Sequence, residues 1–140
     1  MGKIRAFIDT NVLLDHLAQR EGFCEDAAAI FSMVDDGYLV GIISSLSIVN
    51  CAYVLPKHYD GKAVLEQIKK MLSMFTISNV DATVIENAAA IAPYDFEDSV
   101  QYMSALPYHP DVIITRDKKG FKDFDILVMT PAEFVTKAKE

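Results

Sequence analysis

Hydrophobic and polar residues follow two patterns that alternate along this chain. Short apolar runs rich in β-branched residues predict strands at residues 4–8, 39–43, 75–78, 112–115 and 126–129. Longer segments with apolar residues at helical spacing predict helices over residues 11–18, 24–34, 45–55, 60–72, 81–92, 95–106 and from 130 onward. This alternation is typical of a parallel sheet with helices on both faces, so we expect an α/β fold with four to five central strands.

Capping residues and prolines mark the helix boundaries. Ser44 or Ser45 can cap the helix that Pro56 should end, and Pro107 should end another. Residues 130–133 (TPAE) form a capping box with proline at the first helical position. Residues 45–73 contain two successive helices without a strand between them, so they stand outside the simple strand–helix alternation.

Three acidic residues lie at or near the ends of predicted strands. Asp9 directly follows the first strand, Asp117 follows the fourth, and Asp98 lies near the start of a helix. The carboxyl ends of parallel strands face the crevice in which such folds bind ligands. Carboxylates gathered there would repel one another unless a cation joined them, and oxygen ligands favour Mg²⁺ or Mn²⁺.

Each acid also has a purely structural explanation, which the sequence leaves open. Asp9 is suited to cap the following helix, and Asp98 to sit in a first helical turn with Asp95 as the N-cap. Asp117 begins an ordinary turn sequence. Thr115 adds a hydroxyl that could orient a carboxylate, and it is the occurrence of the whole set that favours a metal site.

Composition and charge narrow the class of protein. The chain has 140 residues, 51% of them hydrophobic, and a net charge of −7. We expect one domain over residues 1–140, without a broad basic face for nucleic acid. No apolar run reaches the ~18–20 residues that span a bilayer, and no signal peptide is evident, so we expect a cytoplasmic protein. Cys24 and Cys51 are then expected to be buried free thiols.

Four segments, in order, resemble the motifs of PIN domains. They are residues 7–15 (FIDTNVLLD), 95–102 (DFEDSVQY), 113–121 (IITRDKKGF) and 128–134 (VMTPAEF). The resemblance implies a three-layer α/β/α PIN-like fold and a metal-dependent ribonuclease. It further implies a VapC-type toxin that cleaves single-stranded or structured RNA, is restrained by a VapB-type antitoxin and forms a homodimer.

The resemblance also assigns roles to residues. Asp9, Asp98 and Asp117 would hold Mg²⁺ or Mn²⁺. Thr115 would position these groups or a water molecule, together with Thr10 and Asn11.

One position departs from the PIN pattern. Asn50 stands where PIN domains usually carry a glutamate, and its amide has no charge to attract a cation. It could touch a metal or a bound water, or it could be a buried amide satisfied by the backbone or Ser47. Glu97 could compensate, but successive helix positions point about 100° apart, so we do not expect it to share the site of Asp98. A weak or inactive PIN-fold binding module therefore remains an alternative.

The sequence gives only indirect evidence of the residues that contact a substrate or a partner. A cationic loop could bind phosphates or be an ordinary solvated turn; it contains Arg116, Lys118, Lys119 and Lys122. Tyr53, Tyr59 and Tyr102 could stack on bases, although Tyr53 and Tyr102 lie in helical patterns, so we expect these two in the core. The apolar helix pair of residues 45–73 is a candidate partner surface.

A receiver-type domain with a phosphorylated aspartate would need an acid pair after the first strand, and Asp9-Thr10-Asn11 does not supply it.

Overall fold

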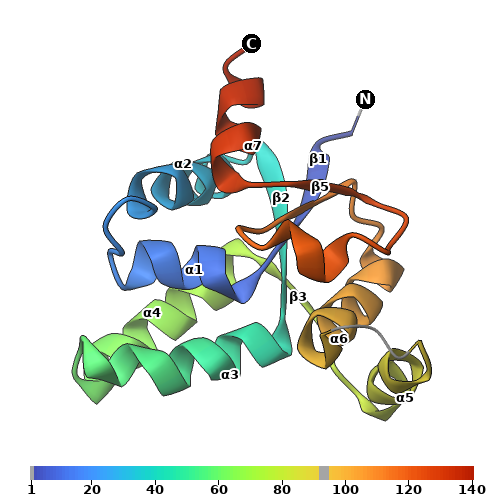
Figure 1. Cartoon of the computed structure of the whole chain (residues 1–140). Helices are drawn as coiled ribbons and strands as arrows, with labels where there is room; N and C mark the ends of the chain where they lie inside the picture. The colour runs from blue at the N-terminus through green and yellow to red at the C-terminus, as the bar shows by residue number, and fades with distance from the viewer. Residues whose placement is uncertain (1, 92–94) are drawn as a thin grey trace.

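A single parallel sheet organises the chain. The computed structural model describes residues 2–91 and 95–140, and all further statements concern these residues. Five strands pair in the order β3-β2-β1-β4-β5, every neighbouring pair being parallel (Figure 1). Their bounds are β1 (Ile4–Ile8), β2 (Leu39–Ser44), β3 (Thr76–Ser78), β4 (Val112–Ile114) and β5 (Leu127–Met129). The predicted α/β architecture is confirmed.

Helices cover both faces of this sheet. In the described ranges they are α1 (Thr10–Leu17), α2 (Cys24–Asp35), α3 (Ser45–Val54), α4 (Gly61–Met74), α5 (Ala82–Ala90), α6 (Phe96–Ala105) and α7 (Pro131–Ala138). Helices α5 and α6 lie on one side and the others lie on the opposite side (Figure 1). The predicted helix end at residue 92 falls outside the described residues. No helix in the described ranges is both long and apolar enough to cross a bilayer.

The predicted caps form, and the two α-helices end next to the predicted prolines. The side chain of Ser44 accepts from the Ser47 backbone amide at 3.0 Å, and Thr130 and Glu133 form the capping box of α7. Helix α3 ends at Val54 and α6 at Ala105, and Pro56 and Pro107 lie in the 3₁₀ turns that follow, η1 (Leu55–Lys57) and η2 (Leu106–Tyr108). Early in such a turn, proline's missing N–H removes no bond.

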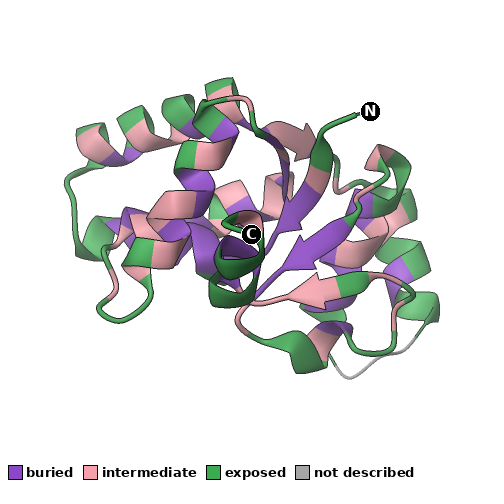
Figure 2. Cartoon of the chain, turned by 90° about the horizontal axis from the view of Figure 1, so that it is seen from above, coloured by how far each residue is buried: buried purple, intermediate pink, exposed green. Residues whose placement is uncertain are grey.

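The two faces of the sheet bury two separate apolar clusters. Successive strand residues point to opposite faces. Phe7 therefore packs under α6 in a small cluster, whereas its neighbours Ala6 and Ile8 join a large cluster beneath the other helices. Figure 2 shows the buried strands enclosed between helices whose outer sides are exposed. Burial on both faces explains why the strand sequences are almost continuously apolar.

The order of the strands fixes where polar side chains can meet. β1 is central, and the chain proceeds from it to β2 on one side and later to β4 on the other. Ile8 is paired with Ile114, and the backbone amide of Asp9 donates to the Ile114 carbonyl at 3.0 Å. The residues that follow β1 and β4, Asp9 and Thr115, consequently lie side by side at a switch point of the sheet, where α/β folds bind ligands.

Gly41 of β2 provides a test of the packing between the sheet and the helices. A Cβ atom there would lie 2.6 Å from Phe75 Cδ1 and 2.9 Å from Val34 Cγ2. We expect Gly41→Ala to lower the free energy of unfolding by about 1–3 kcal/mol through overpacking. In the matched control Gly61→Ala, the added Cβ meets nothing within 4 Å, and α4 should gain up to about 1 kcal/mol. Urea unfolding measures both; unchanged stability of Gly41→Ala would contradict this packing.

Candidate active site

Asp9 is a buried carboxylate held entirely by neutral donors. It is 3% exposed. Its Oδ2 accepts from Thr115 Oγ1 at 2.8 Å, and its Oδ1 accepts from Gln101 Nε2 at 3.0 Å and from the Thr10 backbone amide at 2.8 Å. Burial raises the pKa of Asp9, the hydrogen bonds oppose that rise, and the charge of Asp117 adds to it. Asp9 caps α1 as well, so its structural role and its place in the site coexist.

Gln101 is a site residue that the sequence reasoning missed. Its side chain is fully buried on α6, and its Oε1 accepts from Ser47 Oγ at 3.3 Å. Ser47 in turn shares hydrogen bonds with Thr10 Oγ1 at 2.6 Å and Ser44 Oγ at 3.1 Å. The network ties the end of β1 to α3 and α6. The sequence could have indicated this role, because Gln101 lies three residues after Asp98 and this spacing places both on one side of the helix.

Asp98 is surrounded by other acidic residues. It lies in the first turn of α6, where Asp95 accepts from its backbone amide at 3.1 Å, and it is 7% exposed. Burial and the negative charges of the neighbouring acids together raise the pKa of Asp98 to about 7; after burial, the causes in decreasing order are Asp9, Asp95, Asp117 and Glu97. Asp9 and Asp98, predicted from distant motifs, therefore lie within electrostatic reach of each other.

Glu97 contacts the same Gln101 amide as Asp9. The Gln101 Nε2 atom that donates to Asp9 also donates to Glu97 Oε1 at 3.4 Å. The 100° rotation separates the Cβ directions of Glu97 and Asp98, but the long Glu97 side chain reaches back over the helix to its i+4 neighbour Gln101. Burial raises the pKa of Glu97, and the charges of Asp9 and Asp95 raise it further.

Asp117 stands at the open side of the site. It is exposed and precedes the 3₁₀ turn η3 (Lys118–Phe121), and its backbone amide donates to Thr115 Oγ1 at 3.0 Å. Thr115 thus joins Asp117 to Asp9. Gly120 of the same turn packs directly on Asp98, because a Cβ atom there would overlap the Asp98 Oδ2 atom. Absence of a side chain at this position lets the turn approach the acidic cluster.

The donor chemistry of the site fits a hard divalent cation. The available groups are carboxylate oxygens, which Mg²⁺ and Mn²⁺ prefer. Among the described residues, no three His, Cys, Asp or Glu side chains are grouped closely enough to hold a metal ion. The oxygens of Asp9 accept from three donors within the protein.

Asn50 is half-buried on α3, one turn after Ser47. Its side chain makes no hydrogen bond to the part of the chain that the structure describes, and Ser47 bonds to Thr10, Ser44 and Gln101 instead. The structure therefore does not support the alternative in which Ser47 satisfies the Asn50 amide.

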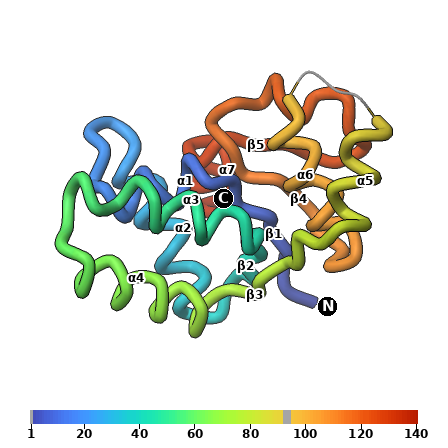
Figure 3. Tube along the Cα trace, turned by 90° about the horizontal axis from the view of Figure 1, so that it is seen from below, coloured from blue at the N-terminus to red at the C-terminus, as the bar shows by residue number. Residues whose placement is uncertain are grey.

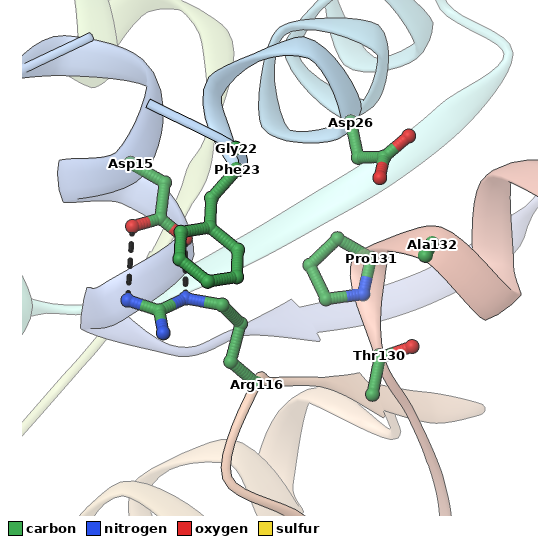
Figure 4. A pocket seen from close by; sticks show the side chains of 8 residues that line it. All are labelled: Asp15, Gly22, Phe23, Asp26, Arg116, Thr130, Pro131 and Ala132. Atoms are coloured by element: carbon green, nitrogen blue, oxygen red, sulfur yellow. Dashed lines mark hydrogen bonds and ion pairs between the residues drawn. The ribbon is translucent and has the colours of Figure 1, made fainter. Parts of the chain in front are cut away.

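Arg116 and Lys118, predicted as substrate cations, form ion pairs within the protein. Arg116 forms a two-point ion pair with Asp15 at 2.6 and 3.1 Å, and its guanidinium lies 4.0 Å from the centre of the Phe23 ring (Figure 4). Lys118 pairs with Glu133 at 3.1 Å. Lys119 and Lys122 line a cavity of about 330 Å³ that also has Asp95, Asp117 and Gly120 in its wall.

The tyrosines and cysteines differ in part from expectation. Tyr53 is 80% exposed, so its predicted core position is wrong: α3 packs through its other side. Tyr102 is half-buried and stacks on Phe124 with ring centres 4.0 Å apart. The Tyr59 hydroxyl donates to the Leu17 carbonyl at 2.7 Å.

Both cysteine thiols are free, as predicted, but only Cys51 is fully buried and Cys24 is half-exposed.

Comparison with known proteins identifies the family. The sequence model of the PIN domain matches residues 5–119, and the chain belongs to the PIN domain family. No curated protein matches the sequence significantly.

Several solved structures share the fold. A toxin–antitoxin complex from Klebsiella pneumoniae matches at 21% identity and a TM-score of 0.67, over 90% of this chain and 97% of that one. DNA-bound VapBC from Salmonella typhimurium matches at 15% identity and 0.67, over 91% and 98%. VapC20 from Mycobacterium tuberculosis, described as a toxin that cleaves the sarcin–ricin loop, matches at 13% and 0.67, over 85% and 95%.

The raised pKa of Asp98 predicts an unusual pH dependence of stability without metal. Because the pKa is about 7 in the folded protein against an ordinary 3.8, the folded state binds this proton more tightly than the unfolded state. The contribution of Asp98 to the free energy of unfolding is therefore greatest below about pH 4 and falls as the pH rises to about 7. Asp98→Asn should remove that decline. Melting temperatures in EDTA across this range measure it; parallel curves for the two proteins would contradict the assignment.

Proposed function

We propose that this protein is a metal-dependent endoribonuclease that hydrolyses RNA phosphodiester bonds and acts as the toxin of a toxin–antitoxin pair. The observation that carries the proposal is the buried Asp9 carboxylate, held by Thr115 and Gln101 beside Asp98 at the switch point of a PIN-family sheet. In this proposal residues 1–140 act as one domain, with α7 packing on α2 beyond the segment that matches the family.

Asp9, Asp98 and Asp117 would hold the cation, Mg²⁺ or Mn²⁺, directly or through water. When bound, such an ion neutralises phosphate charge and lowers the pKa of a coordinated water toward 7. Thr115 fixes the orientation of Asp9 by its hydroxyl donation and links that carboxylate to the turn that carries Asp117. A carboxylate of the site would accept the proton of the attacking water.

RNA is the substrate that this site would receive. The cavity beside the acids has Lys119 and Lys122 in its wall, so phosphates next to the scissile bond would meet positive charge there. Arg116 and Lys118 would instead serve structure, because ion pairs with Asp15 and Glu133 occupy them. The net charge of −7 makes a local contact more reasonable than a broad binding face.

The proposed partners are an antitoxin protein and a second copy of this chain. Similar folds occur in complexes described as toxin–antitoxin and VapBC assemblies, which supports an antitoxin. Helices α3 and α4 lie side by side on one flank of the molecule (Figure 3). They expose large apolar side chains, on which we place the homodimer contact: Val49, Tyr53, Leu65 and Leu72. Two free thiols accord with a cytoplasmic location.

Removal of the Asp9 charge tests the nuclease. With Mn²⁺ and a generic single-stranded RNA, we expect Asp9→Asn to reduce the cleavage rate at least about 100-fold, because the cation loses a buried carboxylate ligand. Glu66→Gln is the control, since it removes one exposed acid on α4. EDTA should abolish cleavage by the native protein. Equal cleavage by the native and Asp9→Asn proteins would point to a contaminating nuclease and contradict the proposal.

Asn50 motivates a second candidate function, a PIN-fold module that binds RNA or protein with little cleavage. The neutral Asn50 amide makes no side-chain hydrogen bond within the described ranges, so a charged side chain there would break none of those contacts. Asn50→Glu should raise Mn²⁺-dependent cleavage about 10-fold or more if a missing carboxylate limits the native enzyme. RNA binding without cleavage in both proteins, measured by gel shift and product analysis, would favour the binding module.

The dimer contact has its own test. We expect Tyr53→Ser together with Leu72→Ser to shift the protein from dimer to monomer, because these exposed side chains contribute apolar area only when a second copy covers them. Light scattering after size-exclusion chromatography measures the mass. A native protein that stays monomeric at high concentration would contradict the homodimer.

A further inference from the structure

A second cavity opens near the carboxyl ends of β4 and β5, separate from the cavity beside the acids. Its volume is about 430 Å³, and its wall includes Phe23, Asp26, Arg116, Thr130 and Pro131 (Figure 4). None of the described residues lines both cavities. A volume of this size is in the range of sites that bind small organic groups.

The ring of Phe23 forms a restrained part of this wall. The Arg116 guanidinium lies 4.0 Å from the ring centre, and Arg116 is itself held by its two-point ion pair with the fully buried Asp15. Phe23 nevertheless remains 46% exposed, and Pro131 lies across from it (Figure 4). A flat apolar group would therefore find a stacking surface that is already ordered.

Asp26 supplies the uncompensated charge of the cavity. It is half-buried in the first turn of α2, and its carboxylate makes no hydrogen bond or ion pair with the part of the chain that the structure describes. The cation of the same wall, Arg116, is already paired with Asp15. A phosphate would consequently be repelled, whereas a group with N–H donors along one edge would be attracted.

An unpaired nucleobase has these properties, with apolar faces and a polar edge. A basic side chain of a protein partner would also satisfy Asp26. However, the Arg116 guanidinium already lies against the Phe23 ring, and it would repel a second cation there. A neutral base meets no such repulsion, so the charges of the wall favour a base over a basic side chain.

The position of the cavity relative to the candidate active site also favours RNA. Arg116 lines this cavity, while its neighbours in the chain, Thr115 and Asp117, belong to the active site. The lysine-lined cavity contains Asp117 in its wall. A single strand lying across this segment would therefore reach the lysines with its phosphates and the second cavity with one of its bases.

The carboxylate of Asp26 distinguishes between the bases. An ionised carboxylate has two acceptor oxygens and no donor. Guanine presents two adjacent donors, N1–H and N2–H₂, on its Watson–Crick edge. Adenine and cytosine place one amino group beside a ring nitrogen that accepts, and uracil places one N–H between two carbonyl oxygens. Only guanine pairs both oxygens of Asp26 without bringing an acceptor against them.

We propose that this cavity is a base-specificity pocket that binds an unpaired guanine of the RNA, stacked on Phe23 and hydrogen-bonded to Asp26. This inference rests on the proposed function to the extent that RNA is the substrate, and it names the base that the substrate presents. Arg116 acts in it as a positioning residue for the Phe23 ring.

A simpler role for Asp26 makes a different prediction. An acid in the first turn of α2 stabilises that helix through the helix dipole. In that case removal of the charge would lower stability slightly and leave RNA binding unchanged. The affinity for RNA of defined base content therefore separates the two roles without any measurement of cleavage.

The decisive measurement is a titration of the full chain, in EDTA, with hexaribonucleotides that contain either one guanine or one inosine among five uracils. Inosine lacks only the N2 amino group. Amide signals in ¹H–¹⁵N NMR spectra give the dissociation constants, and those of Gly22 and Ala132 report on the cavity wall. We expect the guanine hexamer to bind about 10-fold more tightly than the inosine hexamer, with shifts at both reporters.

Two substitutions of matched charge locate the source of this preference. In Asp26→Asn the amide group would oppose a guanine donor, so we expect the two hexamers to bind equally. Glu25→Gln removes the exposed neighbouring acid of α2, which lies outside the cavity wall, and should keep the native preference. Phe23→Leu should weaken both hexamers about 10-fold, through lost stacking. Circular dichroism checks that each variant is folded.

Equal dissociation constants for the two hexamers in the native protein, or no binding of either, would overturn the proposal. An arginine-containing hexapeptide that then shifts the Gly22 and Ala132 signals in the native protein, but not in Asp26→Asn, would assign the cavity to a protein partner. Retention of the guanine preference in Asp26→Asn would overturn the role of that carboxylate.

Cleavage assays with Asp9→Asn distinguish failure of this inference from failure of the proposed function. If Asp9→Asn abolishes cleavage and the native protein shows no preference for guanine, the inference is overturned while the nuclease stands. If guanine is preferred and no metal-dependent cleavage is found, the base pocket stands and the nuclease is refuted.

Discussion

The burial of one carboxylate at the end of the central strand determines how this molecule is arranged around its site. A buried charge is tolerated only where hydrogen bonds satisfy it. Asp9 meets that requirement with a hydroxyl from the end of β4, an amide from α6 and the first backbone N–H of α1. Three elements that are distant in sequence are therefore positioned by a single side chain, and the parallel pairing of β1 with β4 makes the arrangement possible.

The same arrangement concentrates like charges. Asp98 is surrounded by other acids, and the turn that carries Gly120 packs directly against its carboxylate. Such a cluster costs stability in the absence of a cation, as expected for a site shaped by function rather than by folding. The adjacent cavity has lysines in its wall, so positively charged side chains lie next to the acidic residues of the site. That combination is consistent with the proposed cleavage of a phosphate ester.

Local patterns allowed prediction of the elements but not of the long-range contacts. Apolar runs located all five strands, and capping residues such as Ser44 and Thr130 located helix starts, because these signals act within a few residues. The Gln101–Asp9 hydrogen bond joins residues 92 positions apart, and no local pattern encodes it. The contact of Glu97 with Gln101 was not predicted for a similar reason: backbone rotation was considered, whereas the length of the side chain was not. Tyr53 was misplaced because helical spacing cannot tell which side of a helix faces the core.

Two aspartates in the first PIN-like motif show why Asp9 and not its neighbour would attract a cation. Asp15 is also fully buried, but it faces the guanidinium of Arg116, with Arg20 at 3.5 Å, so its charge is cancelled within the protein. Removal of one partner from such a pair leaves an uncompensated charge, and the pair therefore fixes the chain after β4 to α1. Asp9 accepts only from neutral donors, so no cation of the described residues offsets its negative charge. The ion pair of Asp15 thus holds in place the segment that presents Thr115 and Asp117, while the uncancelled charge of Asp9 remains available to a cation.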